Sequence, residues 1–258
     1  MRASDIAAVI EELAPLRLQE PWDNSGFCIG DGNSEVHSAL VGFDCTPELI
    51  EEAVAVGADM VITHHPLIFG GIKKISEATL TGRTVIAAIR HGITVYACHT
   101  NMDKVPGGVS GTAASRIGLC GVRVLDRDAD GNGLGVIGEL PEPMSPEAFL
   151  GHLKVSLGLN TVRHSRLLPS PVRTVALCGG SGRSLIGTAL SAGADVYVSG
   201  DISYHDFYAP DGMMIADIGH FESEVEIIGV ICDIVREKIP NFAVRIARSS
   251  RINPVYYF

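Results

Sequence analysis

Short apolar runs alternate with amphipathic segments along most of the chain. Ala39–Phe43, Met60–Thr63 and Thr94–Cys98 are compact apolar runs, which is typical of strands buried on both faces. Between and beside them, apolar positions recur every three or four residues, which predicts helices. This alternation predicts parallel βαβ units. The helices expected in this part of the chain are Ser4–Leu13, Pro47–Val56, Thr84–Arg90 and a segment from about Val109 to Ile117.

The second half continues the pattern. Leu134–Leu140 alternates like a half-exposed strand, and Ser145 is expected to open another helix. The segment FESEVEIIGVICDIVREKI, which follows His220, predicts one long amphipathic helix.

The two halves of the sequence resemble each other. LVGFDCTPELIEEAVAVGADMVITHH aligns with ALCGGSGRSLIGTALSAGADVYVSGD, and ITVYACHTNMD aligns with MIADIGHFESE. In these alignments His65 corresponds to Asp201, His99 to His220 and Asp103 to Glu224. The interpretation is a duplicated α/β module. The polar stretch DRDADGN favours a boundary near Asp126, so residues 1–126 are expected to form the first module and residues 127–258 the second, with the C-terminal segment packing on the first.

Histidines and carboxylates gather where predicted strands end. His64 and His65 follow Val61 and Ile62, and Pro66 prevents further ladder pairing. The carboxyl end of a strand is where α/β sheets bind ligands. HTNMD and HFESE each place a histidine four residues before a carboxylate, a spacing that puts both on one helical face. Imidazole with carboxylate suits Zn, Mn or Fe better than Mg or Ca.

The metal hypothesis therefore names His64, His65, Asp103, His220 and Glu224 as ligands. This set exceeds what one tetrahedral zinc needs, and its two carboxylates could bridge, so we expect two divalent ions. The alternatives are a hydrogen-bonded surface pair for the two adjacent histidines, a turn aspartate for Asp103 and helix capping for Glu224. His99 is either a ligand or a residue that orients one.

Composition limits the classes of function. The chain has 258 residues, 46% of them hydrophobic, enough for one large α/β unit or two small ones. A net charge of −10 without a Lys/Arg block disfavours nucleic-acid binding, although Arg163, Arg166 and Arg173 could give a local basic lining. The six cysteines form no C-x-x-C pair, which favours free thiols. With no apparent signal peptide or bilayer-spanning run, we expect a cytoplasmic protein.

Four motifs of the chain occur in the same order in a known family. WDNSGFCIGD, THHPLIFGGIKKI, CHTNMDKVPGGVS and GHFESE resemble the NIF-three-like family, also called GTP cyclohydrolase I type 2 homologs, over essentially the whole chain. The resemblance implies two intertwined, related α/β domains with mixed sheets, a dinuclear metal site between them and a homohexamer. It assigns the ligand roles to the same five residues and makes His99 their neighbour.

Two classes of function follow. The first is a metal-dependent hydrolase acting on a small nucleotide-like or phosphorylated substrate, either as a GTP cyclohydrolase or as a phosphoesterase, with His99 or Asp44 as candidates for proton transfer. The second is a metal-binding assembly or adaptor without catalysis. An open coordination position facing a cavity would favour the enzyme, and a closed set of ligands the structural role.

Overall fold

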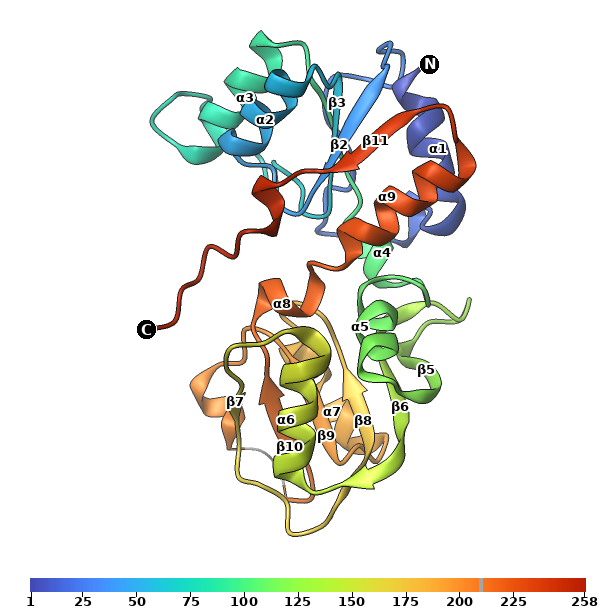
Figure 1. Ribbon diagram of the computed structural model, residues 1–258, viewed down its shortest axis with the longest axis vertical. Helices are drawn as coiled ribbons and strands as arrows, with labels where there is room; N and C mark the ends of the chain where they lie inside the picture. The colour runs from blue at the N-terminus through green and yellow to red at the C-terminus, as the bar shows by residue number, and fades with distance from the viewer. Residues whose placement is uncertain (209–210) are drawn as a thin grey trace. The chain divides into compact units, whose positions relative to one another are not determined.

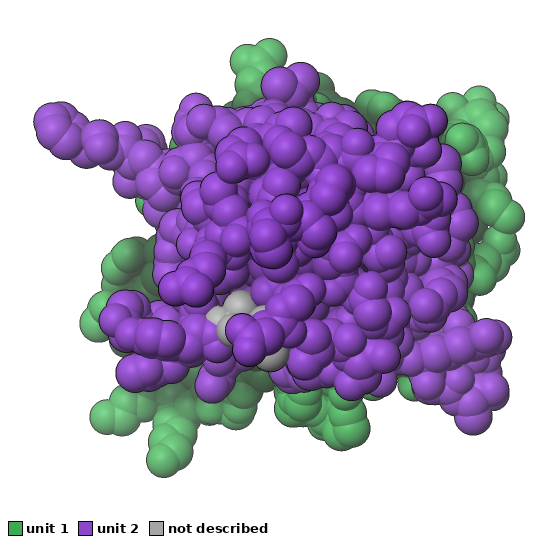
Figure 2. Space-filling model, turned by 90° about the horizontal axis from the view of Figure 1, so that it is seen from below, with its two compact units in different colours: residues 1–102, 227–254 green, residues 103–226, 255–258 purple. Residues whose placement is uncertain are grey.

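The structure, a computed structural model, describes residues 1–208 and 211–258 (Figure 1). It has two compact units, coloured separately in Figure 2. Unit 1 contains residues 1–102 and 227–254, and unit 2 contains residues 103–226 and 255–258. The chain therefore leaves unit 1, forms most of unit 2 and returns, so the two units are intertwined in sequence.

Unit 1 is a mixed sheet covered by helices on both faces. Its strand order is β1-β4-β3-β2-β11, in which only β1 is antiparallel to its neighbour. Figure 1 shows α2 and α3 on one side of this sheet and α1 and α9 on the other. The elements are α1 (Ala3–Leu13), β1 (Gly26–Ile29), β2 (Ser38–Gly42), α2 (Pro47–Val56), β3 (Met60–Thr63), α3 (Leu80–Arg90), β4 (Thr94–Ala97), α9 (Ile227–Lys238) and β11 (Ala243–Ile246), with α4 (Thr100–Asp103) at the passage to unit 2.

Local signals place the elements that lead to the predicted site. Helix α2 has the predicted bounds because the Thr46 hydroxyl accepts a hydrogen bond from the Leu49 amide, Pro47 fits the first turn and Gly57 ends the helix at φ 68°. Strands β3 and β4 are buried along their whole length, as their continuous apolar runs predict. They pair in parallel, so their carboxyl ends lie at one edge of the sheet.

Unit 2 is a six-stranded mixed sheet with the order β5-β6-β8-β9-β10-β7. Side chains of β8 alternate between two cores: Val175 and Leu177 pack with α5 and α6, whereas Ala176 packs with α7. The elements are α5 (Val109–Ile117), β5 (Cys120–Arg127), β6 (Gly133–Met144), α6 (Pro146–Leu157), β7 (Arg163–His164), β8 (Val172–Leu177), α7 (Ile186–Ser191), β9 (Val196–Ser199), β10 (Met214–Asp217) and α8 (His220–Glu224).

The predicted duplication is present in the hydrogen bonding as well as in the topology. Strands β2-β3-β4 and β8-β9-β10 form equivalent parallel triplets. The aspartate of each Gly-Ala-Asp turn has the same role: Asp59 accepts from the amides of His37 and Ser38, and Asp195 from those of Arg173 and Thr174. The fold is a mixed α/β arrangement with two related sheets, as predicted.

The units do not divide where the sequence suggested. The stretch taken for a boundary, after Asp126, is the β5–β6 hairpin inside unit 2, since both of its strands pair with each other. The passages between units fall instead at 102/103 and 226/227. Polar, Gly-containing composition marks a tight turn between paired strands as readily as a linker, which is why it misled here. Residues 227–254 belong to unit 1, where β11 pairs with β2, and residues 255–258 belong to unit 2.

The long helix predicted after His220 is interrupted. Helix α8 ends at Glu224, a turn follows, and α9 begins at Ile227. The interruption coincides with the passage from unit 2 back to unit 1. Both pieces keep helical periodicity, so the pattern alone could not reveal the break.

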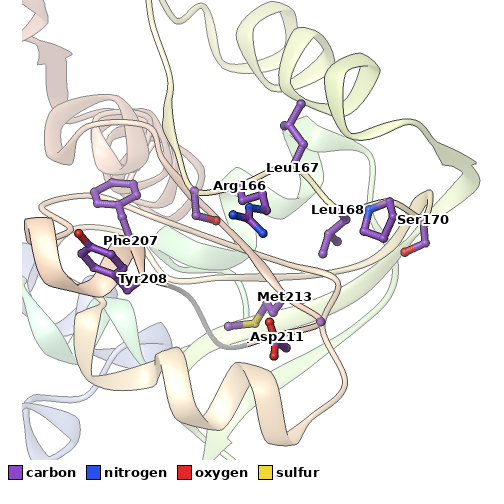
Figure 3. Close-up of a pocket in the computed structure, with 11 residues that line it drawn as sticks. Arg166, Leu167, Leu168, Ser170, Phe207, Tyr208, Asp211 and Met213 are labelled. Carbon is purple, nitrogen blue, oxygen red and sulfur yellow. The ribbon is translucent and has the colours of Figure 1, made fainter.

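A cavity of about 630 Å³ opens in unit 2, lined by Arg166, Leu168, Tyr208, Met213 and neighbouring residues (Figure 3). None of the predicted metal ligands is among its lining residues. Within the described residues, no helix is both long and apolar enough to cross a bilayer.

Candidate metal centre

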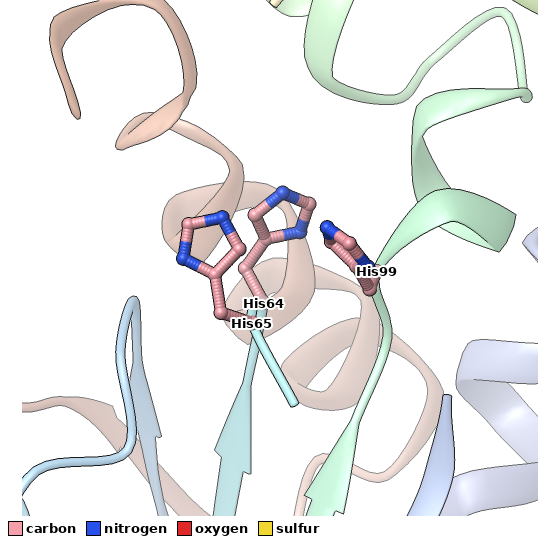
Figure 4. Close-up of side chains that lie close together, drawn as sticks. All are labelled: His64, His65 and His99. Carbon is pink, nitrogen blue, oxygen red and sulfur yellow. The ribbon is translucent and has the colours of Figure 1, made fainter. Parts of the chain in front are cut away.

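Three imidazoles meet at the carboxyl edge of the unit 1 sheet. His64 and His65 follow β3, and His99 follows the neighbouring strand β4 (Figure 4). One ligand atom from each lies within 4.8 Å of those of the other two. His64 is fully buried and His99 is 8% exposed. This cluster of nitrogen donors could hold a metal ion.

The backbone beyond β3 explains how two adjacent histidines converge. The amides of His64 and His65 donate to the carbonyls of Gly42 and Phe43, so pairing with the β2 side continues past the strand. The Thr63 hydroxyl donates to the His65 carbonyl and tightens the chain there. The Phe43 ring lies against both imidazoles, with centroid distances of 5.8 and 4.6 Å. The two rings are therefore held on one side rather than on opposite faces.

Each imidazole of this cluster has its Nδ1 nitrogen fixed. His64 Nδ1 donates to the Cys98 carbonyl at 3.0 Å and His65 Nδ1 to the Asp44 carboxylate at 2.8 Å. His99 Nδ1 donates to Asp23 at 2.8 Å. A carbonyl or an ionised carboxylate only accepts, so Nδ1 carries the hydrogen and Nε2 of the neutral ring keeps its lone pair. This is the usual arrangement around a histidine that binds a metal through Nε2.

Asp23 is a residue of this cluster that motif reasoning did not single out. Its side chain is fully buried and accepts hydrogen bonds from His99 and from the Thr100 hydroxyl and amide. Burial alone would raise its pKa, but the hydrogen bonds from His99 and Thr100 outweigh burial and hold the pKa well below its usual range. The residue therefore remains a carboxylate and orients His99. The WDNSG motif was the available signal, but nothing in its spacing pointed to His99.

Asp44 lies where a positioning residue would lie. Its carboxylate accepts from His65 Nδ1, and its side chain is 47% exposed. It was predicted as a candidate for proton transfer, and the structure places it at Nδ1 of His65.

Unit 2 brings together the other three predicted ligands. His220 Nε2 lies 2.9 Å from Glu224 Oε2, and His220 Nδ1 donates to Asp201 at 2.8 Å. The Glu224 side chain is only 5% exposed. A carboxylate oxygen of Asp103 lies within 4.8 Å of one of Glu224, so the two side chains are neighbours. Burial, together with the negative charges of these two carboxylates, raises the pKa of the Cys178 thiol to about 12.

The backbone of unit 2 is adapted to this group. Asp201, which corresponds to His65 in the repeat, has φ 52° and is the one non-glycine residue with positive φ among the described positions. This uncommon conformation lets its carboxylate reach His220. Gly180, at φ 59°, lies so close to Glu224 that a Cβ atom there would overlap Glu224 Oε1. The Gly180 amide donates to the Ser223 hydroxyl, which fixes the loop against α8.

The predicted ligands thus form two groups, one in each unit. His64 and His65 lie in unit 1 with His99, and Asp103, His220 and Glu224 lie in unit 2. Asp103 is the first residue of unit 2, and Glu224 lies two residues before Glu226, where the first of the two segments of unit 2 ends. Neutral imidazole nitrogens and carboxylates together fit Zn, Fe or Mn, so the residues present fit the predicted ions.

Comparison with known proteins gives one consistent result. The sequence model of the family described as Duf34/NIF3 (NGG1p interacting factor 3) matches residues 1–254. A protein of Clostridium perfringens named GTP cyclohydrolase 1 type 2 homolog is 35% identical over 244 residues, which cover 93% of each chain. The crystal structure of a Bacillus cereus protein related to NIF3 has a TM-score of 0.94 at 24% identity, covering 100% of this chain and 99% of that one. A Staphylococcus aureus structure has a TM-score of 0.92 at 27% identity, with the same coverage.

Proposed function

Because this chain belongs to the Duf34/NIF3 family, we propose that it is a dinuclear-metal-dependent hydrolase of a small nucleotide-like or phosphorylated substrate. The observation that carries the proposal is that three predicted histidine ligands each have Nδ1 fixed by a hydrogen bond. In His64, His65 and His220 this nitrogen donates to a carbonyl or carboxylate, which leaves Nε2 for a metal. Three histidines that served only in packing would not all need to have Nδ1 fixed in this way.

In this proposal two divalent ions, Zn, Fe or Mn, are held by His64, His65, Asp103, His220 and Glu224. When bound, the ions supply an activated water and polarise the group under attack. The chain's own residues keep the ligands in place: Asp44 and Asp201 orient His65 and His220 through Nδ1. The two carboxylates supply the negative charge that offsets the cations.

His99 is proposed as the residue that transfers a proton. Its ring lies 5.3 and 5.4 Å from those of His64 and His65, centroid to centroid, and Asp23 fixes its Nδ1 hydrogen. The Nε2 atom can then accept a proton from water and return it to a leaving group, while the Asp23 carboxylate stabilises the imidazolium. The name GTP cyclohydrolase carried by relatives suggests ring-opening hydrolysis, and the same residues would also serve phosphoester cleavage.

The proposal predicts about two divalent ions per chain after reconstitution with Zn, Mn or Fe, measured by elemental analysis. Metal affinity should decrease progressively as the pH is lowered, because protonated imidazole cannot bind a cation. His37→Ala is the matched control, since the His37 side chain is 73% exposed and should not change metal content. Trace metal under all conditions would refute the centre.

Measurements of turnover distinguish a hydrolase from a metal-binding assembly without catalysis. The reconstituted protein is assayed against GTP, other nucleotides and simple phosphoesters, and His99→Ala should lower kcat by about 10²–10⁴-fold while metal content stays at two. If the ions bind and no substrate of this panel turns over, the non-catalytic metal-binding assembly is the better account.

We further propose that the chain assembles as a homohexamer, as its family resemblance implies. Several large apolar side chains are left exposed on the single chain, among them Ile89 at 61% and Val155 at 85%. Light scattering is expected to give a particle about six times the chain mass of 27.3 kDa. A mass of 27.3 kDa at every concentration tested would contradict the assembly.

A further inference from the structure

Two aromatic side chains are exposed beside each other in unit 1. Trp22, the only tryptophan of the chain, is 58% exposed, and Phe69 is 51% exposed. Their rings are nearly parallel, with an interplanar angle of 16° and centroids 6.0 Å apart. Single exposed apolar residues are common, but two large stacked rings left in water are typical of a binding surface.

This pair lies directly against the candidate proton-transfer residue. The His99 ring contacts Phe69 edge-on at a centroid distance of 5.2 Å and Trp22 at 6.0 Å. His99 in turn lies next to His64 and His65. A planar group bound on Trp22 and Phe69 would therefore be one imidazole away from the histidine cluster.

Hydrogen bonds tie together the two segments that carry these rings. Asp23, the residue after Trp22, is fixed by His99 and Thr100. Asn24 Nδ2 then donates to the Ile68 carbonyl at 2.7 Å, which ties the Trp22 segment to the residue before Phe69. Segments tied together in this way need little rearrangement on binding, which favours recognition of a rigid planar ligand.

Positive charge follows on the same segment. Lys73 and Lys74 come four and five residues after Phe69, and both are exposed. Neither Lys73 nor Lys74 takes part in an ion pair with another described residue. In a chain of net charge −10, two adjacent lysines that follow Phe69 this closely in the sequence favour a ligand that combines a planar ring with a phosphate.

We propose that Trp22 and Phe69 form the base-binding platform of the enzyme, on which the nucleobase of a nucleotide substrate stacks while Lys73 and Lys74 face its phosphate. The inference rests on the proposed hydrolase function and narrows its substrate class from phosphorylated compounds in general to nucleotides. Stacking of this kind does not depend on base identity, because every base has a π face.

The single tryptophan gives a direct test. AMP, GMP and CMP are titrated into metal-free and metal-loaded protein while Trp22 fluorescence is recorded with inner-filter correction. Saturable quenching is expected with all three nucleotides and not with ribose 5-phosphate or inorganic phosphate. Phe69→Ala should weaken the nucleotide affinity about tenfold or more, because one stacked ring is lost. Equilibrium dialysis should show binding retained by Trp22→Phe and lost by Trp22→Ala.

Tyr256→Ala is the control, since Tyr256 is 82% exposed but far along the chain from these rings. The proposal is overturned if nucleotides and ribose 5-phosphate behave alike. It is also overturned if Trp22 emission follows protein concentration instead of nucleotide, since the pair would then contact a second copy of the chain. Metal content is measured on the same samples, so a failure of stacking leaves the metal centre standing and can be distinguished from its failure.

Discussion

Glu224→Gln is expected to give a folded protein that has lost one or both metal ions and all hydrolytic activity. Glutamine keeps the size of the side chain but removes a negative charge that the proposal puts against two cations. Since altering a residue that only supports a metal ligand costs about 10–100-fold in affinity, replacing a ligand should cost more than about 100-fold. Elemental analysis and circular dichroism of the purified variant measure the two expectations.

Folding should survive this substitution. Glu224 pairs with His220 in unit 2, so the change alters one buried hydrogen bond at a cost of about 1–3 kcal/mol, less than the 5–15 kcal/mol typical of a folded protein. Charge repulsion with Asp103 is removed at the same time. Glu237→Gln on the exposed face of α9 serves as the matched control and should keep both ions. Full metal content in Glu224→Gln would mean that Glu224 is not a ligand.

Gly180→Ala is expected to damage both stability and the metal centre through one methyl group. The backbone at Gly180 has φ 59°, which disfavours alanine, and the new Cβ would overlap Glu224 Oε1. Backbone strain and overpacking together should cost roughly 2–4 kcal/mol, or a melting temperature lower by about 4–16 °C. Since Glu224 must move to relieve the overlap, metal affinity should decrease as well.

Gly187→Ala is the matched control for Gly180→Ala. Gly187 lies in α7 of the same unit, and a Cβ there meets nothing within 4 Å. Alanine at that position should stabilise the helix by about 0.5–1 kcal/mol and leave metal content unchanged. Calorimetry measures the melting temperature of both variants, and elemental analysis measures their metal content. Equal values for the two variants would show that the close approach of Gly180 to Glu224 is unimportant.

The sequence predicted the parts of the site that follow from strand ends. Continuous apolar runs located β3 and β4, and parallel pairing then required His64 and His99 to share an edge of the sheet. The internal repeat predicted that His220 would take the place of His99, and it does follow β10 as His99 follows β4. These inferences succeeded because periodicity and chain order determine them locally.

Other features depend on contacts between distant residues, which one sequence does not reveal. Asp23 reaches His99 across 76 positions of the chain, and no local pattern indicates that hydrogen bond. The break between α8 and α9 occurs because the chain changes units there, although its helical periodicity continues through Glu226. The position of the unit boundary was missed for the same reason.

The most direct test of the account is anomalous diffraction from crystals of the metal-reconstituted protein, recorded at the absorption edge of the metal. The account predicts two ions per chain, bound through Nε2 of His64, His65 and His220 and through the carboxylates of Asp103 and Glu224, with metal–nitrogen distances of about 2.0–2.1 Å for zinc. Ions bound through Nδ1, or no ordered ion at these residues in fully loaded protein, would contradict it.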